Sequence, residues 1–225
     1  MAFAGFDKKG MRFFSELAEE MSREWFAENK ARYEAEWVEP MTALLTDVRA
    51  KLAPVYRPVA LGEPKILRIH RDVRFSKDKR PYKTNIAAVL TVEGKSVGEG
   101  GLAALYVHLG LDQQLAGAGL YQFDPERLAR WRAAVDGKAG AALAKLVAAL
   151  RADGYEIVGE DDLKKVPRGF DPDHPRAELL KMKGLKAMFP SIPKGLLHGA
   201  GFADWCLAHA KAAAPQVKWI HQHVG

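Results

Sequence analysis

The sequence is poor in cysteine and has no long apolar run. Cys206 is the only cysteine among 225 residues, so no internal disulfide can form, which is typical of proteins in the reducing cytoplasm. No stretch of about 18 apolar residues occurs, as a membrane-spanning helix would require. Residues 1–14 also lack the uninterrupted apolar segment of a signal peptide. We therefore expect a cytoplasmic protein with no membrane partner.

The sequence also lacks the short motifs of several enzyme classes. It contains no G-x-G-x-x-G or Walker-type phosphate-binding loop, no G-x-S-x-G nucleophile elbow and no kinase signature. Its seven histidines are dispersed, and together with one cysteine they match no familiar zinc-ligand spacing. We therefore predict no metal and no cofactor. The sequence alone leaves open whether the protein is an enzyme.

Positive charge, by contrast, is concentrated in one short segment, residues 65–83. This segment holds eight basic and two acidic residues, and its net charge of +6 equals that of the whole chain. Neighbouring cations repel one another unless acids or an anionic partner neutralise them. The segment therefore predicts a binding site for an anion, with an anionic small molecule as the expected partner.

The order of the expected elements favours an α+β fold in one domain of residues 1–225. Apolar residues recur at helical spacing in residues 10–53, where Ser22 is suited to be the N-cap of a second helix. Residues 65–123 have strand patterns and turn signals, as a sheet-forming region does. Residues 124–225 are helical and mixed, with an edge strand and a last strand. Strands that meander between helices favour a largely antiparallel sheet flanked by N-terminal and C-terminal helices.

Prolines and glycines mark expected irregularities in these elements. Pro40 interrupts a helical stripe, so either the helix kinks there or a new helix begins with this proline in its first turn. A proline-containing loop is expected from residue 53, and Pro215 is expected to break the C-terminal helix. Gly117 and Gly119 lie in a predicted strand and indicate a bulge or a close approach of two backbones.

Within the charged segment, residues 65–75 alternate between apolar and polar side chains, as a strand does. Arg68 and Arg74 are then expected on the same, polar face. Arg71 falls on the apolar face, where an unpaired guanidinium is costly, so we expect a carboxylate partner from outside the segment. Asp72 lies between arginines, which favours a role in orienting one of them over a role as a general base.

Motifs along the chain resemble those of a known family. The most specific is R-x-x-R-D-x-R-F of residues 68–75, followed by D-K at 78 and P-Y-K-T at 81. Further matches are R-x-W-F-x-x-N-K-x-x-Y from residue 23, G-x-Y from 119, P-x-G-F-D from 167 and P-x-x-x-W from 215. The chain resembles, over nearly its whole length, a bacterial family of conserved hypothetical proteins that also occurs within larger fungal proteins. The resemblance implies which residues matter but implies no activity.

The residues of the charged segment receive different predicted roles. Planar guanidiniums match oxyanions bidentately, so arginines are expected to bind the ligand and lysines to line its rim. Arg71 and Asp72 are predicted to support the geometry of the site. Pro81 fixes the chain just before Tyr82. This tyrosine either has a functional role, stacking on a base or serving as an acid with a nearby lysine, or it closes the core beneath the loop. The residues predicted to contact the ligand are Arg68, Arg74, Lys77, Lys79, Tyr82 and Lys83.

Three functions are compatible with this segment. The leading hypothesis is binding of a phosphorylated or polyanionic ligand in a basic pocket formed by the strand and loop. The second is an enzyme that acts on a phosphate-bearing small molecule, with Tyr82 and either Lys79 or Lys83 as the proton-transfer pair. The third is nucleic-acid binding through the same patch, which would weaken steeply with salt.

Overall fold

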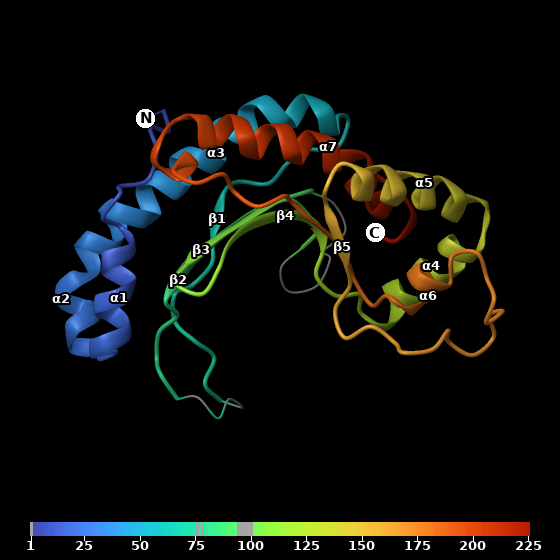
Figure 1. Cartoon of the computed structure of the whole chain (residues 1–225), viewed down its shortest axis with the longest axis horizontal. Coiled ribbons are helices and arrows are strands. Elements are labelled where there is room, and N and C mark those ends of the chain that lie inside the picture. The colour runs from blue at the N-terminus through green and yellow to red at the C-terminus, as the bar shows by residue number, and fades with distance from the viewer. Residues whose placement is uncertain (1, 75–76, 78, 94–100) are drawn as a thin grey trace.

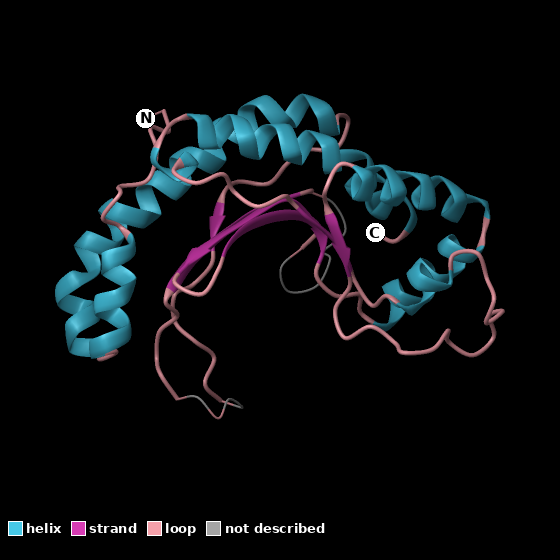
Figure 2. Ribbon diagram, in the orientation of Figure 1, coloured by secondary structure: helices cyan, strands magenta, loops and turns pink. Residues whose placement is uncertain are grey.

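The computed structural model describes residues 2–74, 77, 79–93 and 101–225. The molecule has the shape of an arch, in which helices cover the convex face of a curved sheet (Figure 1). Helices also lie at both ends of the sheet, and the described helices leave its concave face uncovered (Figure 2). The helical elements are α1 (Met11–Glu20), α2 (Arg23–Tyr33), the π-helical turn η1 (Glu34–Val38), α3 (Glu39–Tyr56), α4 (Pro125–Asp136), α5 (Lys138–Ala152), α6 (Ala177–Lys181), the 3-10 turn η2 (Leu196–His198) and α7 (Gly201–His223).

The described strands form one six-stranded sheet with the order β1-β2-β3-β4-β6-β5. All neighbouring strands are antiparallel. The prediction of an α+β fold with an antiparallel sheet flanked by helices is therefore confirmed. The strands are β1 (Lys65–Ile66), β2 (Asn85–Thr91), β3 (Ala103–Gly110), β4 (Gln114–Leu120), β5 (Glu156–Val158) and β6 (Leu185–Met188).

The main core lies between the convex face of the sheet and the helices α3 and α7. These two helices lie side by side above the sheet (Figure 1). Successive side chains of a strand point to opposite faces, and in β2 the residues Ile86, Ala88 and Leu90 are buried beneath the helices. The intervening residues of the same strand face the concave side. One set of positions therefore builds the core, and the other set lines the open side of the arch.

The helical region of residues 10–53 forms as predicted, with two details fixed by the structure. The Ser22 hydroxyl accepts a hydrogen bond of 3.1 Å from the Trp25 backbone N–H, which is the expected N-cap interaction. The chain then stays helical from α2 through η1 into α3, and Pro40 lies in the first turn of α3. The second alternative is therefore right in placing Pro40 in the first turn of α3, but α3 begins at Glu39 and follows η1 without a break.

Two other prolines do not end their helices, contrary to prediction. Pro54 lies inside α3, which continues to Tyr56, and Pro215 lies inside α7, which continues to His223. Both prolines are exposed. The carbonyl that loses its helical partner therefore also faces solvent, where water can bond to it, and the buried face of each helix keeps its packing. The expected loop at residue 53 and the expected break at Pro215 were wrong for this reason.

The two glycines of β4 show both predicted irregularities. The pairing of β3 with β4 shifts register between Ala103 and Tyr106, which is the expected bulge. A Cβ on Gly119 would lie 2.1 Å from the Leu185 carbonyl oxygen of β6, and Gly119 has φ of +127°. A Cβ on Gly117 would lie 2.9 Å from the carbonyl oxygen of Ala187. Close approach of β4 and β6 therefore requires glycine here.

Candidate functional site

The basic segment forms a projecting arm and not the long strand that was predicted. Among the described residues of this segment, only Lys65–Ile66 pairs as a strand, and Phe75 is not one of the described residues. We call residues 67–74 and 79–84 the basic arm; it extends away from the end of β2 (Figure 1). The arm is held by backbone bonds, from the Arg71 N–H to the Pro81 carbonyl at 2.9 Å and from the Lys83 N–H to the Ile69 carbonyl at 2.8 Å. These backbone hydrogen bonds are too few to form a continuous ladder between two strands.

Exposure alternates along the first half of the arm, as the sequence pattern predicts. Arg68 and Arg74 are exposed, whereas Ile69 is buried and Val73 is half-buried. Arg71 is also half-buried, in agreement with its place on the inward side. The carboxylate partner expected for Arg71 from outside the segment stays a prediction.

Asp72 lies between the two exposed guanidiniums. Arg74 donates to both of its carboxylate oxygens, from Nε at 3.0 Å and from Nη2 at 2.7 Å. The Arg68 Nη2 atom lies 3.7 Å from the Asp72 Oδ2 atom. These hydrogen bonds from the side chain and the backbone N–H of Arg74 lower the pKa of Asp72 well below its ordinary value. An ionised Asp72 therefore orients Arg74, and the low pKa makes it a poor general base.

The lysines of the segment lie in different environments. Lys79 donates from Nζ to the Val73 carbonyl at 2.8 Å, so it helps to close the arm. Lys77 is exposed. Lys83 is half-buried, and its pKa is lowered, first by burial and then by the nearby charges of Arg68 and Arg71. The positive charges of Arg68 and Arg71 therefore act on Lys83.

Tyr82 closes the core beneath the arm. The tyrosine is 4% exposed, and its ring stacks on Phe26 of α2 with a centroid distance of 4.4 Å. His70, across the arm, lies 5.0 Å from the same ring and forms an isolated bridge with Tyr82. Of the two interpretations of Tyr82, packing in the core is the one that this geometry supports. The R-x-W-F motif of α2 and the P-Y-K-T motif of the arm therefore meet where Phe26 stacks on Tyr82.

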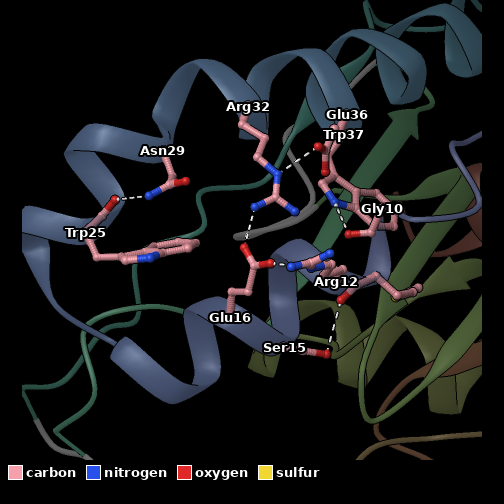
Figure 3. A network of polar contacts seen from close by, with 10 residues as sticks. Gly10, Arg12, Ser15, Glu16, Trp25, Asn29, Arg32, Glu36 and Trp37 are labelled. Atoms are coloured by element: carbon pink, nitrogen blue, oxygen red, sulfur yellow. Dashed lines mark hydrogen bonds and ion pairs between the residues drawn. The ribbon is translucent and has the colours of Figure 1, made fainter.

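Ion pairs fasten the helices that support the arm. Arg32 of α2 contacts Glu16 of α1 and also donates to Glu36 at 2.8 Å, while Arg12 bonds to the same Glu16 (Figure 3). The bonds from Arg32 and then Arg12 lower the pKa of Glu16. Asn29 lies on the same helix and donates to the Trp25 carbonyl at 2.9 Å (Figure 3). This network holds α1 against α2 and thereby fixes the position of Phe26.

A separate cavity of about 530 Å³ lies on the concave face of the sheet. Leu67 is the only residue of the basic arm in its lining, so this cavity is not the basic pocket that the sequence predicted. Its walls include Tyr106 and His108 of β3, with the Tyr106 hydroxyl 3.3 Å from His108 Nδ1. The sequence patterns did not single out these two residues. Tyr106 and His108 are two positions apart in β3, so their side chains share one face of the sheet. Which other strands contribute to that face depends on the order of the strands in the sheet, and the sequence does not give this order.

The protein is thus of the α+β class. Helices cover one face of its antiparallel sheet, and a cationic arm projects from the sheet. The chain belongs to a family of conserved hypothetical proteins, DUF2461, whose model matches residues 9–219. No curated protein and no solved structure was found to match the chain. In the part of the chain that the structure describes, no helix has both the length and the apolar character needed to cross a membrane.

Proposed function

We propose that the protein binds a phosphorylated or polyanionic ligand through the basic arm. The observation that carries this proposal is the pair of exposed guanidiniums of Arg68 and Arg74, whose Nη2 atoms lie 3.7 Å and 2.7 Å from the same Asp72 carboxylate oxygen, so that two positive charges share one acid. Like charges held this close raise the free energy of the unliganded protein. An anion bound between them would replace this repulsion with attraction and with charge-assisted hydrogen bonds.

The exposure of the arginines favours a ligand with more than one phosphate. The side chains of Arg68 and Arg74 are 69% and 76% exposed, and both lie within 4 Å of the same Asp72 carboxylate. Asp72 accepts from Nε and Nη2 of Arg74 and holds the guanidinium in one orientation, so a phosphate would contact the other edge of the guanidinium, Nη1 and Nη2. An open row of donors can contact successive phosphates, whereas a single phosphate would occupy only part of it.

The enzymatic alternative receives less support from the same residues. It requires the Tyr82 hydroxyl to exchange a proton with a ligand, but the tyrosine is 4% exposed and its ring is stacked on Phe26. Nucleic-acid binding uses the arm in the same way as the leading proposal and differs from it only in the source of the phosphates. We also propose a cytoplasmic location, which the single, buried Cys206 supports.

The proposal is tested by the double substitution Arg68→Ala with Arg74→Ala. Binding is measured by thermal-shift titration with inorganic phosphate, polyphosphate and a short single-stranded oligonucleotide, each at several salt concentrations. We expect polyphosphate to stabilise the wild type and the double variant to bind it more than about a hundredfold more weakly, because two charge-assisted contacts are lost. A steep salt dependence with the oligonucleotide as the tightest ligand would identify nucleic acid as the phosphate source.

A control variant separates the arm from the general charge of the protein. Lys145→Ala with Lys211→Ala also removes two positive charges, from exposed positions on α5 and α7. We expect this variant to bind polyphosphate as the wild type does. Equal losses in both double variants would contradict a specific site. An arm variant that melts far below the wild type without ligand would show that the two arginines are structural, and the proposal would then be wrong.

A further inference from the structure

The concave face of the sheet carries a second candidate site, which is independent of the basic arm. The antiparallel register places Tyr106 opposite Gly117, and Gly117 opposite Met188. Met188 in turn lies opposite Glu156, so one row of residues crosses β3, β4, β6 and β5. The four residues of this row line the cavity of about 530 Å³, a volume typical of small-molecule sites. Three strand spacings make the row about 14 Å long.

The middle of this row is apolar. Gly117 and Gly119 leave the backbone of β4 bare, and neither position accepts a Cβ without a shift of the backbone. Met188 stands beside these glycines on β6, and Leu115 and Val158 add further apolar surface to the lining. The cavity therefore removes the apolar body of a ligand from water, which supplies most of the free energy of binding.

The charges of the lining leave one carboxylate uncompensated. Lys186 pairs with Glu160, with 2.6 Å between Nζ and Oε2. Glu156 is exposed, and in the described part of the chain no basic residue forms an ion pair with it. Lys65 stands opposite Val89 at the far edge of the sheet, outside the lining. The cavity therefore attracts positive charge at its β5 end.

Acids also surround the two tyrosines that line the cavity. The pKa of Tyr121 is raised, first by its hydrogen bond to Glu160, then by burial, and also by the charge of Asp161. Burial and then the charge of Asp112 raise the pKa of Tyr106. Both hydroxyls are therefore neutral at physiological pH, and the acids near them add to the preference for a cation.

One wall of the cavity already holds an ammonium group. Lys186 Nζ lies 4.5 Å from the centre of the Tyr121 ring and bonds to Glu160. The face of a ring and a carboxylate thus stabilise this cation together. The lining offers the same two kinds of group to a ligand, in the ring of Tyr106 and the carboxylate of Glu156.

We propose that this cavity binds an organic ammonium compound, whose apolar body lies on the Gly117–Gly119 floor and whose ammonium group pairs with the Glu156 carboxylate. The body packs against Met188, which is the neighbour of Glu156 across the β5–β6 pairing. Since the basic arm is proposed to bind anions, the two sites take ligands of opposite charge and are tested separately.

Two compounds of nearly equal shape test the charge preference, 2-naphthylmethylammonium and the uncharged 2-naphthylmethanol. Binding is measured by ligand-observed NMR titration at neutral pH and low ionic strength, because salt screens an exposed ion pair. We expect both compounds to bind the wild type, with the ammonium compound tighter by about threefold, since exposed ion pairs contribute modestly. A wild type that binds neither compound, or that shows no preference for the ammonium compound, overturns the proposal.

A matched pair of charge variants assigns this preference to one residue. Glu156→Gln removes the charge and keeps the shape, so it is expected to bind the two compounds equally. Glu19→Gln removes the same charge from an exposed position on α1 and is expected to behave as the wild type does. A preference that survives Glu156→Gln, or that both variants lose to the same extent, overturns the proposal.

Tryptophan substitutions locate the site. Val158→Trp fills the cavity from β5 and is expected to abolish binding of both compounds, whereas Leu111→Trp places the same side chain at an exposed position outside the lining. Leu115→Trp fills the cavity from β4 if Val158→Trp does not fold by circular dichroism. Binding that survives in a folded, filled variant overturns the proposal. A wild-type dimer in sedimentation velocity that the filled variant converts to monomer also overturns it, because a second copy then covers this face.

Discussion

Gly119 is a residue whose missing side chain determines local geometry. Its φ of +127° is a conformation that other residues rarely adopt, and a Cβ there would lie 2.1 Å from the Leu185 carbonyl. A side chain at this position would strain the backbone because of the positive φ, and it would also collide with the neighbouring strand. A substitution at this position therefore combines both costs.

We predict that Gly119→Ala lowers the free energy of unfolding by about 3 kcal/mol or more. Gly169→Ala is the matched control, because Gly169 also has positive φ, at +92°, but a Cβ there would meet nothing within 4 Å. Urea denaturation of both variants measures the two costs. The control is expected to lose only about 1–2 kcal/mol, which is the strain alone. Equal losses at the two glycines would show that β6 moves away freely and that close approach does not require glycine.

At the residue scale, the sequence predicted the role of a side chain better than the residue with which that side chain interacts. Asp72 orients Arg74, as its place between arginines indicated, and Ser22 caps its helix. Tyr82 remained ambiguous because its partner, Phe26, is far away in the sequence and reaches it only through the fold. His108 was missed because its surroundings are formed by turns and strands whose pairing the sequence does not reveal.

At the scale of elements, helices and strands were predictable where apolar periodicity is strong. The prolines were misleading because the cost of a proline depends on which face of a helix it occupies. Pro54 and Pro215 are on solvent faces, so their helices continue. The extended pattern of residues 65–75 was correct in its alternation and wrong as a strand. Alternation reports which side of the chain is buried, whereas a strand also needs a neighbouring backbone with which to pair.

The contact between α2 and the basic arm gives a prediction at this scale. Phe26 is 7% exposed and stacks on Tyr82, so Phe26→Ala is expected to leave the arm without its main apolar support. Hydrogen exchange of the Arg71 and Lys83 amides, which bond across the arm, should accelerate by about tenfold or more, because local opening becomes easier. NMR exchange measurements on the intact chain report both amides.

Trp25→Ala is the control for this prediction. Trp25 lies on the same helix, but its ring packs against Phe13 of α1 with a centroid distance of 5.5 Å. Its removal should disturb the contact of α1 with α2 and leave the arm amides nearly unchanged relative to those of β3. Exchange in the arm that is insensitive to Phe26→Ala would mean that the backbone bonds of the arm suffice to hold it.

At the scale of the whole molecule, α7 connects parts of the chain that lie at opposite ends of the arch. Near its start, the Phe202 ring lies 6.4 Å from Phe3 of the N-terminal segment. Near its end, Trp219 donates from Nε1 to the Ala139 carbonyl of α5 at 3.1 Å and lies edge-on to Trp131 of α4, 5.8 Å away. The helix therefore ties the N-terminal region, the sheet and the helices of the other end into one body (Figure 1).

This arrangement predicts a large and specific cost for Trp219→Ala. Trp219 is 6% exposed, and its removal takes away a large apolar side chain and leaves the Ala139 carbonyl without its indole partner. A loss of about 3–5 kcal/mol in the free energy of unfolding is expected, as for other buried aromatic residues that are replaced by alanine. Urea denaturation followed by tryptophan fluorescence and by far-ultraviolet circular dichroism measures it.

Trp205→Ala provides the comparison, because Trp205 lies on the same helix and is only half-buried. It should lose less than Trp219→Ala, since fewer apolar contacts disappear. If α7 unites the two ends of the arch, both probes should report one transition in the wild type, whereas Trp219→Ala should separate early unfolding of α4 and α5 from later unfolding of the sheet. A single coincident transition in Trp219→Ala, with a loss no greater than that of Trp205→Ala, would mean that α4 and α5 are held chiefly by other contacts.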